Sequence, residues 1–314
     1  MNVLALDLGG TKVSAAIFNS EANILWEKYG LLEGREGDDV AELMGEFIAE
    51  AIDYLGAQGS ELSAVGVGVP GVAYSKSGSV YAPNIPGWEN YPLKAKLTCV
   101  TPHIPIVIES DRSCYIMGEK WKGVAQNTDN AIFIAVGTGI GAGILANGQL
   151  IKGQSDIAGA IGWMALQQPY EARFDYCGCF ETFASGGGLL REIKHYKEQN
   201  PGYRGYFTSP EASLNTTTLI NQYKLQDEIA TAILTKAVAM WGMAVANLIS
   251  IFNPEKVIFG GGVFGAAQYF IDEIYEEAKK WAQPLSMQQV ELLISSTGPK
   301  TGLLGAAYLA QNKL

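Results

Sequence analysis

Basic residues are scarce in this sequence, and no long apolar run stands out. Lysine and arginine number 22 against 32 aspartates and glutamates, so the 314 residues carry a net charge of −10. Nucleic acids and anionic membranes bind basic faces, and this balance therefore disfavours both as partners. No apolar run approaches the roughly 20 residues of a membrane-spanning helix. No basic and apolar leader precedes the first expected strand at Asn2 or Val3, and we therefore expect a cytoplasmic protein.

Histidine and cysteine are also scarce, with two and four residues in the chain. Most structural zinc sites need four nitrogen or sulfur ligands. Cys177 and Cys179 lie close together in sequence, but His103 and His195 are both distant from them. This donor set predicts that the protein has no structural zinc site.

Glycine is abundant, with 37 residues, and two adjacent glycines interrupt the apolar segment 3–18. Residues 3–8 predict a buried strand, and the glycines allow a turn in which backbone N–H groups face a ligand. Asp7 at the end of this strand could hold Mg²⁺, directly or through water. An ordinary hairpin, with Asp7 stabilising the turn and Lys12 in solvent, is the alternative. The expected phosphate contacts are Gly9, Gly10, Thr11 and Lys12.

Residues 131–148 repeat this plan of apolar strand, glycine and threonine turn, and second apolar strand, and end in an Asn-Gly turn. A third glycine cluster follows the expected strand 256–259, where a flat adenine or ribose can approach the backbone. The order and spacing of the three clusters predict a nucleotide held between two lobes. The expected contacts are Gly137, Thr138 and Gly139 in the second hairpin and Gly260, Gly261 and Gly262 in the third cluster.

Further segments are similar to the landmarks of one protein family. They are residues 66–71, 82–88, 108–111, 159–163 and 177–181. Together with the glycine clusters, they make nearly the whole chain resemble a ROK-family sugar kinase of the actin, hexokinase and Hsp70 ATPase superfamily. The resemblance implies an α/β fold with two actin-like (ribonuclease H-like) lobes and an interlobe active-site cleft. It also implies ATP and Mg²⁺ as cofactors, a small-molecule sugar substrate and a homodimer.

The resemblance further implies a discontinuous division into lobes. Residues 1–113, with about 299–314, are expected to form the N-terminal lobe with the first hairpin and the sugar-side residues. Residues 114–298 are expected to form the C-terminal lobe with the second hairpin and the adenosine site. Apolar residues at helical spacing predict helices near 38–55 and 229–252. A closing helix over about 301–311 is expected to pack back on the N-terminal lobe.

Asp111 follows the apolar run 104–108 and lies at an expected strand end. Phosphoryl transfer to a hydroxyl needs a carboxylate that orients the hydroxyl and accepts its proton. The resemblance makes Asp111 this catalytic base. The alternative is a structural role, in which Asp111 caps the helix that follows it.

The expected acceptor site departs from the family pattern. Ser110 stands where glucose-specific members have asparagine, and Ala160 and Trp163 stand where members have a glutamate and a histidine that bind the sugar near its first two carbons. Each unmatched polar group costs about 1 to 3 kcal/mol, which disfavours plain glucose. Trp163 either stacks on a sugar ring or apolar substituent, or fills the volume of the missing side chains. The expected substrate contacts are Gly71, Asn84, Ser110, Asp111, Asp156, Trp163 and Glu181.

The zinc ligands of relatives are replaced as well, since Ala172 and Phe174 fall where two of three cysteines would lie. We expect ATP-dependent phosphorylation of a hydroxyl of a hexose or hexose derivative other than plain glucose. The alternative is a catalytically weak sugar-binding sensor or regulator without a DNA-binding domain, because the residues before Asp7 form only one strand. The sequence also leaves open an ATPase without a sugar acceptor, and polyphosphate in place of ATP.

Overall fold

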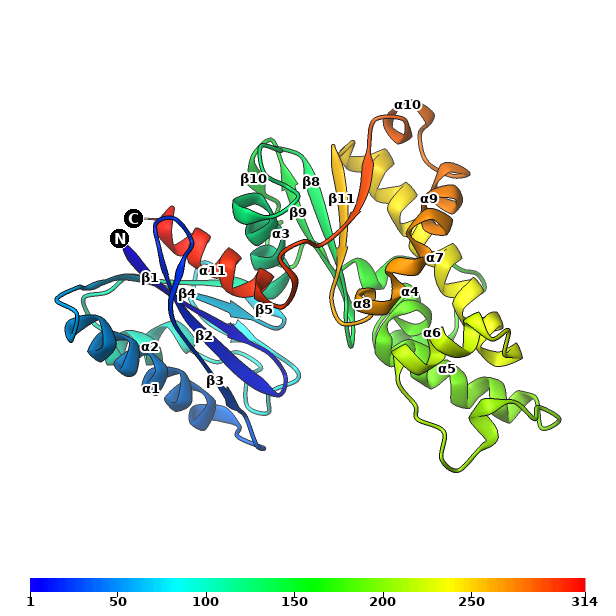
Figure 1. Cartoon of the computed structure of the whole chain (residues 1–314), viewed down its shortest axis with the longest axis horizontal. Coiled ribbons are helices and arrows are strands. Elements are labelled where there is room, and N and C mark those ends of the chain that lie inside the picture. Colours follow the sequence, from blue (N-terminus) through cyan, green and yellow to red (C-terminus); the bar gives the residue numbers. More distant parts are fainter. Residues whose placement is uncertain (314) are drawn as a thin grey trace. The chain divides into compact units, whose positions relative to one another are not determined.

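Two five-stranded mixed sheets form the centres of two α/β units in the computed structural model, which describes residues 1–313 (Figure 1). The first unit comprises Met1–Asn127, Leu150–Ala158 and the chain from Ser296 onward. The second unit comprises Thr128–Gln149 and Gly159–Ser295. Each sheet is packed against helices, so that its central strands are buried on both faces.

In the first unit the strand order is β3-β2-β1-β4-β7. The first three strands form an antiparallel meander, and β4 and β7 extend the sheet in parallel with β1. β1 and β4 are apolar along almost their whole length and almost entirely buried. The strands are β1 (Asn2–Leu8), β2 (Lys12–Asn19), β3 (Ile24–Leu31), β4 (Leu62–Val69) and β7 (Ile106–Ser110), with β5 (Val72–Ala73) and β6 (Val80–Tyr81) forming a separate pair.

The helices of the first unit lie on opposite faces of its sheet. α1 (Gly37–Gly56) and α2 (Leu93–Val100) pack on one face, and α11 (Thr301–Gln311) packs on the other together with α3 (Asp111–Lys122) (Figure 1). The predicted helix near 38–55 is confirmed as α1. Its helical stripe is buried in the core at Val40, Met44, Phe47, Ile48, Ala51 and Leu55.

The closing helix α11 packs on the first unit, as predicted for the last helix of the chain. Glycines allow its backbone to approach closely. A Cβ at Gly305 would overlap the carbonyl oxygen of Cys114 in α3, and a Cβ at Gly66 would overlap the carbonyl oxygen of Ala306. Only glycine allows backbones to approach this closely. The chain therefore returns to its first sheet at its C-terminal end.

The division between the units differs from the predicted one at residue 113. Glu119 is buried on α3, and its carboxylate accepts hydrogen bonds from the backbone N–H groups of Val124 (2.8 Å), Ser296 (3.2 Å) and Thr297 (3.2 Å). These bonds join α3 to the segment that enters α11, so both belong to the first unit. The change of unit follows at Asn127, and Leu150–Ala158 also joins the first unit.

The second unit repeats the plan of the first with the strand order β10-β9-β8-β11-β12. β8 and β9 are antiparallel, whereas β11 pairs in parallel with both β8 and β12. The strands are β8 (Ala131–Val136), β9 (Ile140–Ala146), β10 (Gln149–Leu150), β11 (Lys256–Gly260) and β12 (Glu291–Ile294). The repeated topology confirms the predicted α/β fold of two actin-like lobes.

The helices of the second unit surround α7, the longest helix in residues 1–313. They are α4 (Cys179–Ala184), α5 (Gly186–Gln199), α6 (Thr216–Lys224), α7 (Glu228–Phe252), α8 (Phe264–Ala267), α9 (Ile271–Lys279) and α10 (Pro284–Met287). α7 begins at Asp227, whose side chain accepts a hydrogen bond from the N–H of Ala230, and ends at Asn253 in the left-handed conformation. The predicted helix over 229–252 is confirmed.

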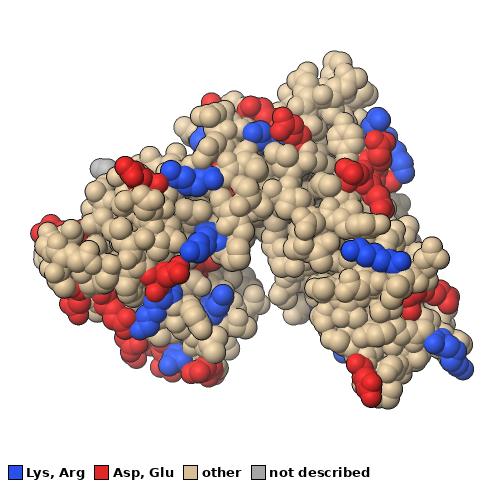
Figure 2. Space-filling model, viewed as in Figure 1, with Lys and Arg blue, Asp and Glu red and all other residues tan. Residues whose placement is uncertain are grey.

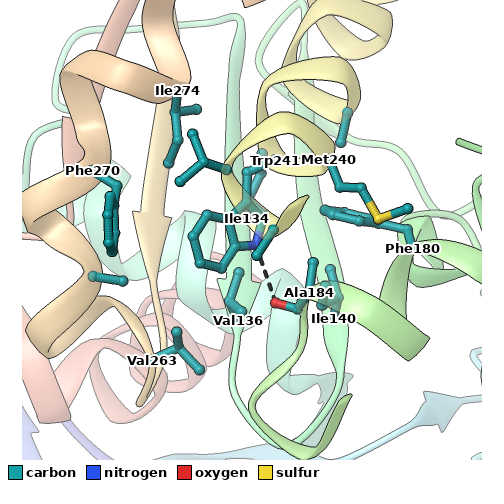
Figure 3. Close-up of a cluster of buried hydrophobic side chains, with 14 of the residues drawn as sticks. Ile134, Val136, Ile140, Phe180, Ala184, Met240, Trp241, Val263, Phe270 and Ile274 are labelled. Atoms are coloured by element: carbon teal, nitrogen blue, oxygen red, sulfur yellow. Dashed lines mark hydrogen bonds between the residues drawn. The ribbon is translucent and has the colours of Figure 1, made fainter. Parts of the chain in front are cut away.

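α7 corrects the expectation that no apolar run is long enough to cross a membrane. This helix is long and apolar enough to cross a membrane by length and composition alone. However, 67% of its most apolar 18-residue window is buried inside the protein. At its centre Trp241 is fully buried, and its indole N–H donates to the carbonyl oxygen of Ala184 at 3.1 Å (Figure 3). Ile134, Val263 and Phe270 surround the ring in the same core. α7 is therefore the core helix of the second unit.

Acidic side chains line the outer face of α1. Figure 2 shows acidic side chains over this helix in the first unit. The exposed carboxylates there are Asp38, Asp39, Glu42, Glu46, Glu50 and Asp53. Two of these carboxylates form ion pairs, Glu50 with Lys28 and Asp38 with Lys96, both at 2.7 Å.

Candidate active site

Two carboxylates of the first unit lie at the same edge of its sheet. Asp7 is the next-to-last residue of β1, and Asp111 directly follows the end of β7 at Ser110. Parallel pairing aligns Asp7 with Gly68 of β4 and Val69 with Ser110 of β7, so that the ends of β1, β4 and β7 coincide. The strand between the two carboxylates contributes only a hydrogen atom, because its residue is Gly68. Residues distant in sequence thus form one acidic pair.

Asp111 is the first residue of α3 and does not cap this helix. The N-cap is Ser110, whose hydroxyl accepts a hydrogen bond from the N–H of Ser113 at 3.4 Å. The Asp111 carboxylate accepts hydrogen bonds from the N–H of Arg112 at 2.7 Å and from the Tyr115 hydroxyl. Burial raises the pKa of Asp111, although the Arg112 charge and these hydrogen bonds oppose the rise. The carboxylate is therefore oriented, and its basicity is increased.

Arg112 was missed by the sequence reasoning. Its guanidinium donates to three backbone carbonyl oxygens, those of Ala158 (3.2 Å), Gly71 (3.0 Å) and Asp156 (3.3 Å). Burial lowers the pKa of Arg112, while the charge of Asp111 opposes this change. Arg112 thus fixes two loops of the first unit around the start of α3. A single arginine next to a candidate base gave no pattern in the sequence that could reveal this role.

Asp7 has an unusual protonation behaviour for an aspartate. Its burial and the nearby charge of Asp111 raise the pKa of Asp7 from the ordinary 3.8 to about 7, and Lys12 partly opposes the rise. Gly302 of α11 lies against this carboxylate, since a Cβ there would be 2.6 Å from its Oδ2 atom. Two half-buried carboxylates, one of which raises the pKa of the other, form a site that a divalent cation would stabilise. The donor chemistry therefore fits the expected Mg²⁺ site at Asp7.

The first glycine hairpin lies beside the loop that carries Asn84. The N–H of Gly9 donates to the carbonyl oxygen of Lys12 at 2.8 Å and closes the turn, while Gly10, Thr11 and Lys12 are exposed. A Cβ at Gly10 would lie 3.8 Å from the Cβ of Asn84. The structure thus brings the exposed Asn84 next to the candidate phosphate hairpin.

The Asn84 loop is held by a buried aromatic pair. The rings of Trp88 and Tyr91 stack at 4.6 Å, and the indole N–H of Trp88 donates to the carbonyl oxygen of Gly37 at 2.9 Å. The N–H of Ala82 donates to the carbonyl oxygen of Trp88 at 2.8 Å, which closes the loop. These contacts fix the backbone of the loop that carries Asn84.

The second glycine hairpin is joined to the start of α5. The N–H groups of Gly186 and Gly187 donate to the carbonyl oxygens of Gly137 (2.8 Å) and Thr138 (3.2 Å). A Cβ at Gly186 would lie 2.8 Å from the Gly137 oxygen, so glycine is needed for this close approach. No atom lies within 4 Å of a Cβ at Gly137 itself, which leaves its surface open. The glycine run 186–188 is the sequence signal that could have identified this contact.

Glu181 in α4 lies beside the second glycine hairpin. Its carboxylate accepts a hydrogen bond from the N–H of Ile140 at 2.6 Å, directly after the second hairpin. A Cβ at Gly139 or at Gly162 would lie 2.7 Å or 2.9 Å from its Oε2 atom. Burial raises the pKa of Glu181, although the Ile140 hydrogen bond lowers it. The structure therefore brings Glu181 and the predicted contact Gly139 together.

The third glycine cluster divides into two parts. A Cβ at Gly260 would overlap the ring of Phe133, and one at Gly261 would lie 2.5 Å from the carbonyl oxygen of Val136, where the glycine also has a φ of +90°. These two glycines are explained by packing against β8. Only Gly262 has no atom within 4 Å of a Cβ, so it is the member of the cluster that leaves room for a ligand.

Three of the predicted substrate contacts form hydrogen bonds with other residues of the protein. The Oδ2 atom of Asp156 accepts hydrogen bonds from the N–H and the hydroxyl of Ser75, both at 3.0 Å. Gly71 has a φ of +111°, and its carbonyl oxygen accepts from Arg112. Ser110 caps α3. These residues build the walls of the first unit, whereas Asn84 is left exposed.

Trp163 does not fill a buried volume. Its side chain is 58% exposed, so the role of filling a buried volume is wrong, and the role of stacking on a ligand at the surface remains.

The cysteines near Trp163 form contacts within the protein. The Cys177 sulfur lies 3.5 Å from the Thr182 hydroxyl and accepts a hydrogen bond from Arg191 at 3.6 Å. Across residues 1–313 there is no group of three or more His, Cys, Asp or Glu side chains that could hold a metal ion. The donors near Cys177 do not fit structural zinc.

The same strand order in both units defines the actin-like class of two-lobed α/β folds. Residues 3–313 match the model of the ROK family. The chain belongs to the ROK family and is a sugar kinase of that family, an ATP-binding transferase that acts on a hexose or hexose derivative.

Named relatives match the chain along its whole length. It is 29% identical to a glucokinase of Thermotoga maritima, over 100% of this chain and 98% of that protein. It is 27% identical to an N-acetyl-D-glucosamine kinase of Salmonella gallinarum, over 96% of this chain and 97% of that protein. The fold matches the crystal structure of a ROK family glucokinase from Streptomyces griseus in complex with glucose and AMPPNP, with a TM-score of 0.78 and 26% identity, over 99% and 100% of the two chains.

Proposed function

We propose that the protein transfers the γ-phosphoryl group of ATP to a hydroxyl of a hexose derivative other than plain glucose, with Asp111 as the catalytic base. The observation that carries this proposal is the pairing of Asp7 and Asp111 at one sheet edge. The structural alternative loses its support, because Ser110 and not Asp111 caps α3. A half-buried carboxylate that caps nothing and raises the pKa of its neighbour is costly unless it serves chemistry.

In this mechanism Asp111 orients the acceptor hydroxyl and accepts its proton during attack on the γ-phosphorus. The pKa of Asp111 is raised from its ordinary value toward the neutral pH range, and this makes the carboxylate a stronger base. The Arg112 N–H and the Tyr115 hydroxyl hold the carboxylate in one orientation, so that less freedom is lost when the hydroxyl binds. Arg112 and Tyr115 are positioning residues in this scheme.

Each unit carries a glycine hairpin with candidate phosphate contacts. Backbone N–H groups of Gly10, Thr11 and Lys12 would contact the phosphates from the first hairpin, and those of Thr138 and Gly139 from the second. Asp7 would hold Mg²⁺, directly or through water. When bound, Mg²⁺ supplies positive charge that offsets the charge of the transferring phosphoryl group. The crystal structure of the Streptomyces griseus relative with AMPPNP, an ATP analogue, supports ATP as the donor.

The candidate acceptor contacts are Asn84 in the first unit and Glu181 and Trp163 in the second unit. Ser110, Asp156 and the carbonyl of Gly71 have partners within the protein, and Ala160 offers no polar group. The site therefore has fewer free hydrogen-bond partners for sugar hydroxyls than its composition suggests, and it has an exposed aromatic ring. An acceptor with a less polar substituent at the Trp163 side suits this surface better than glucose.

A coupled ADP-release assay with Mg-ATP against hexoses, N-acylhexosamines and glycosides tests the proposal. We expect turnover that depends on a sugar, with kcat/KM for the best hexose derivative at least about tenfold above that for glucose. Asp111→Asn supplies the background rate of the assay. Glucose as the best acceptor would contradict the predicted specificity, and ADP release without any sugar would support an ATPase.

A sugar-binding sensor is the second candidate. The exposed Trp163 and the apolar Ala160 in place of polar groups favour it, because loss of sugar contacts lowers turnover before it abolishes binding. The chain is also 25% identical to a xylose repressor of Caldicellulosiruptor bescii, over 97% of this chain and 76% of that protein. Thermal stabilisation by a sugar, without ADP release for any sugar of the panel, would select the sensor.

Gly302→Ala tests the placement of Asp7. The added Cβ would lie 2.6 Å from the Asp7 Oδ2 atom, so the carboxylate must move. We expect kcat to fall by roughly 100-fold, as for other displacements of about 1 Å at a reacting site. The measurement is kcat at saturating Mg-ATP and sugar, together with circular dichroism to verify the fold.

Gly56→Ala is the matched control, since this helical glycine of the same unit has no atom within 4 Å of an added Cβ. Its kcat should equal that of the wild type. If Gly302→Ala also retains wild-type kcat, Asp7 is not part of the reacting site.

A further inference from the structure

The strongest unexplained feature of the second unit is a pocket beside Trp163. It has a volume of about 500 Å³, within the range of roughly 300 to 1,000 Å³ that is typical of small-molecule sites. Trp163 and Tyr170 contribute aromatic walls and are 58% and 69% exposed. Two large aromatic rings exposed in one concave surface are typical of a ligand site and uncommon elsewhere on a protein.

The wall formed by Tyr170 is held in place. Its hydroxyl donates a hydrogen bond to the Asp175 carboxylate, and its ring lies edge-on to Phe174 at 6.0 Å. Phe174 is buried and packs in turn on Phe183 at 5.6 Å. The Tyr170 ring is therefore fixed by contacts on one side and open on the other, so that little conformational entropy is lost when a ligand stacks on it.

The backbone segment around the pocket is also fixed, by ion pairs and hydrogen bonds. The Arg173 guanidinium stacks 4.5 Å from the Phe183 ring and donates to Glu192 at 2.7 Å and to Glu171 at 2.8 Å. The Gln167 amide donates to Glu171 at 3.0 Å. These contacts hold residues 167–175 in one arrangement, which is what a specific binding surface needs.

The polar groups of the pocket suit a sugar ring. The Gln168 side chain is exposed and has no hydrogen-bond partner among residues 1–313, and an amide both donates to and accepts from hydroxyl groups. The C–H face of a pyranose packs on an aromatic ring, while its hydroxyls point outward toward such amides. A purely apolar ligand would leave the Gln168 amide unmatched, and a phosphate would meet the carboxylate of Asp175.

The pocket adjoins Glu181, the proposed sugar contact in the same unit. Gly178 and Cys179 line the pocket, and Cys179 begins the helix that carries Glu181. A Cβ at Gly178 would lie 2.5 Å from the Cα of Trp163, and a Cβ at Gly162 would lie 2.9 Å from Glu181 Oε2. The adjacent residues Gly162 and Trp163 thus contact Glu181 and the pocket wall, respectively, within one tightly packed group.

We propose that this pocket binds a second pyranose ring attached to the sugar that is phosphorylated, so that the acceptor is a disaccharide or a similar glycoside. The inference rests on the proposed function, which it extends by naming the substrate class. Glu181 contacts the phosphorylated ring, and Trp163 and Tyr170 stack on the second ring. The fixed wall and the free Gln168 amide give this ring both a surface and a hydrogen-bond partner.

The test compares disaccharides and phenyl glycosides with free hexoses as acceptors, for the wild type and for Tyr170→Ala. We expect kcat/KM of the wild type to be at least tenfold higher for the best disaccharide than for its component hexose. Tyr170→Ala should abolish this preference and leave kcat/KM for the hexose unchanged. Tyr176→Ala is the matched control, because Tyr176 lies in the same segment, is 83% exposed and does not line the pocket.

Direct binding separates this inference from the kinase assignment. Isothermal titration with the same disaccharides, without ATP, should show a Kd at least tenfold weaker for Tyr170→Ala than for Tyr176→Ala. Hexose turnover without a disaccharide preference would overturn the pocket inference and leave the kinase standing. Disaccharide binding that depends on Tyr170, without turnover of any sugar, would support the pocket and overturn the kinase proposal. Tight binding of phenyl glycosides but not of disaccharides would also overturn the pocket inference. Binding of ADP alone in this pocket would overturn it as well.

Discussion

Asp111→Asn is expected to lower kcat by about 1,000-fold, since a positioned general base contributes roughly 10² to 10⁴ in rate. The amide keeps the shape of the carboxylate but cannot accept the proton of the acceptor hydroxyl. Capping of α3 depends on Ser110, so the helix should be retained. Sugar affinity, measured by isothermal titration, should change by less than about threefold, because the amide still binds a hydroxyl.

The matched control for this variant is Asp53→Asn, an exposed aspartate on the outer face of α1. It removes the same charge from the same unit and should leave kcat unchanged. The pH profile provides a second measurement. Because burial raises the pKa of Asp111, kcat of the wild type should begin to fall at a pH above the ordinary aspartate value of 3.8. A kcat of Asp111→Asn within threefold of the wild type would show that another group is the base.

Asp7→Asn is expected to abolish turnover and at the same time to stabilise the metal-free protein at pH 8. The native pKa of Asp7 is about 7 against 3.8 for an ordinary aspartate. Between these values the native state retains a proton that the unfolded state has released, so stability is lost as the pH rises from about 4 to about 7. Above pH 7 the ionised Asp7 opposes Asp111 in a half-buried site. The neutral amide avoids this cost, which we estimate at about 2 to 4 kcal/mol.

Urea unfolding of the metal-free wild type and Asp7→Asn at several pH values measures this effect. The two proteins should have similar free energies of unfolding near pH 4, and the variant should be the more stable one at pH 8. Addition of Mg²⁺ with ADP should stabilise the wild type more than the variant, because Asp7 is the proposed metal ligand. Equal pH dependence in both proteins would show that Asp7 is an ordinary surface carboxylate.

Local pattern was sufficient for much of the fold. The apolar runs of β1 and β8 and the glycines after them predicted two hairpins, which the structure contains. Helical spacing predicted α1 and α7 to within a residue or two, because burial of one stripe is a property that the sequence displays directly. The closing helix α11 was expected from the family resemblance. The apolar content of α7 was underestimated, since a core helix and a membrane helix have similar compositions.

The neighbours of the predicted residues were harder to foresee. Ser110 and Asp111 were both candidates for ligand contact, and only the geometry of α3 shows that the serine, and not the aspartate, caps the helix. Asp156 was a plausible sugar ligand by type, but its carboxylate binds Ser75, which lies far away in sequence. Arg112 and Gly302 had no local signal, because their importance depends on which backbone atoms and carboxylates the folded chain places beside them.

The sequence by itself determined the elements and the chemical groups of this protein: two strand hairpins with glycine turns, the helices that cover them, and the aspartates at the strand ends. These features are local, because periodicity and turn chemistry depend on residues a few positions apart. Only the tertiary structure decided that Asp7 and Asp111 form a pair that raises the pKa of Asp7, that Gly260 and Gly261 serve packing, and that Trp163 is exposed at a pocket. Parallel strand register and burial cause these outcomes, and both arise from contacts between residues that are distant in the chain.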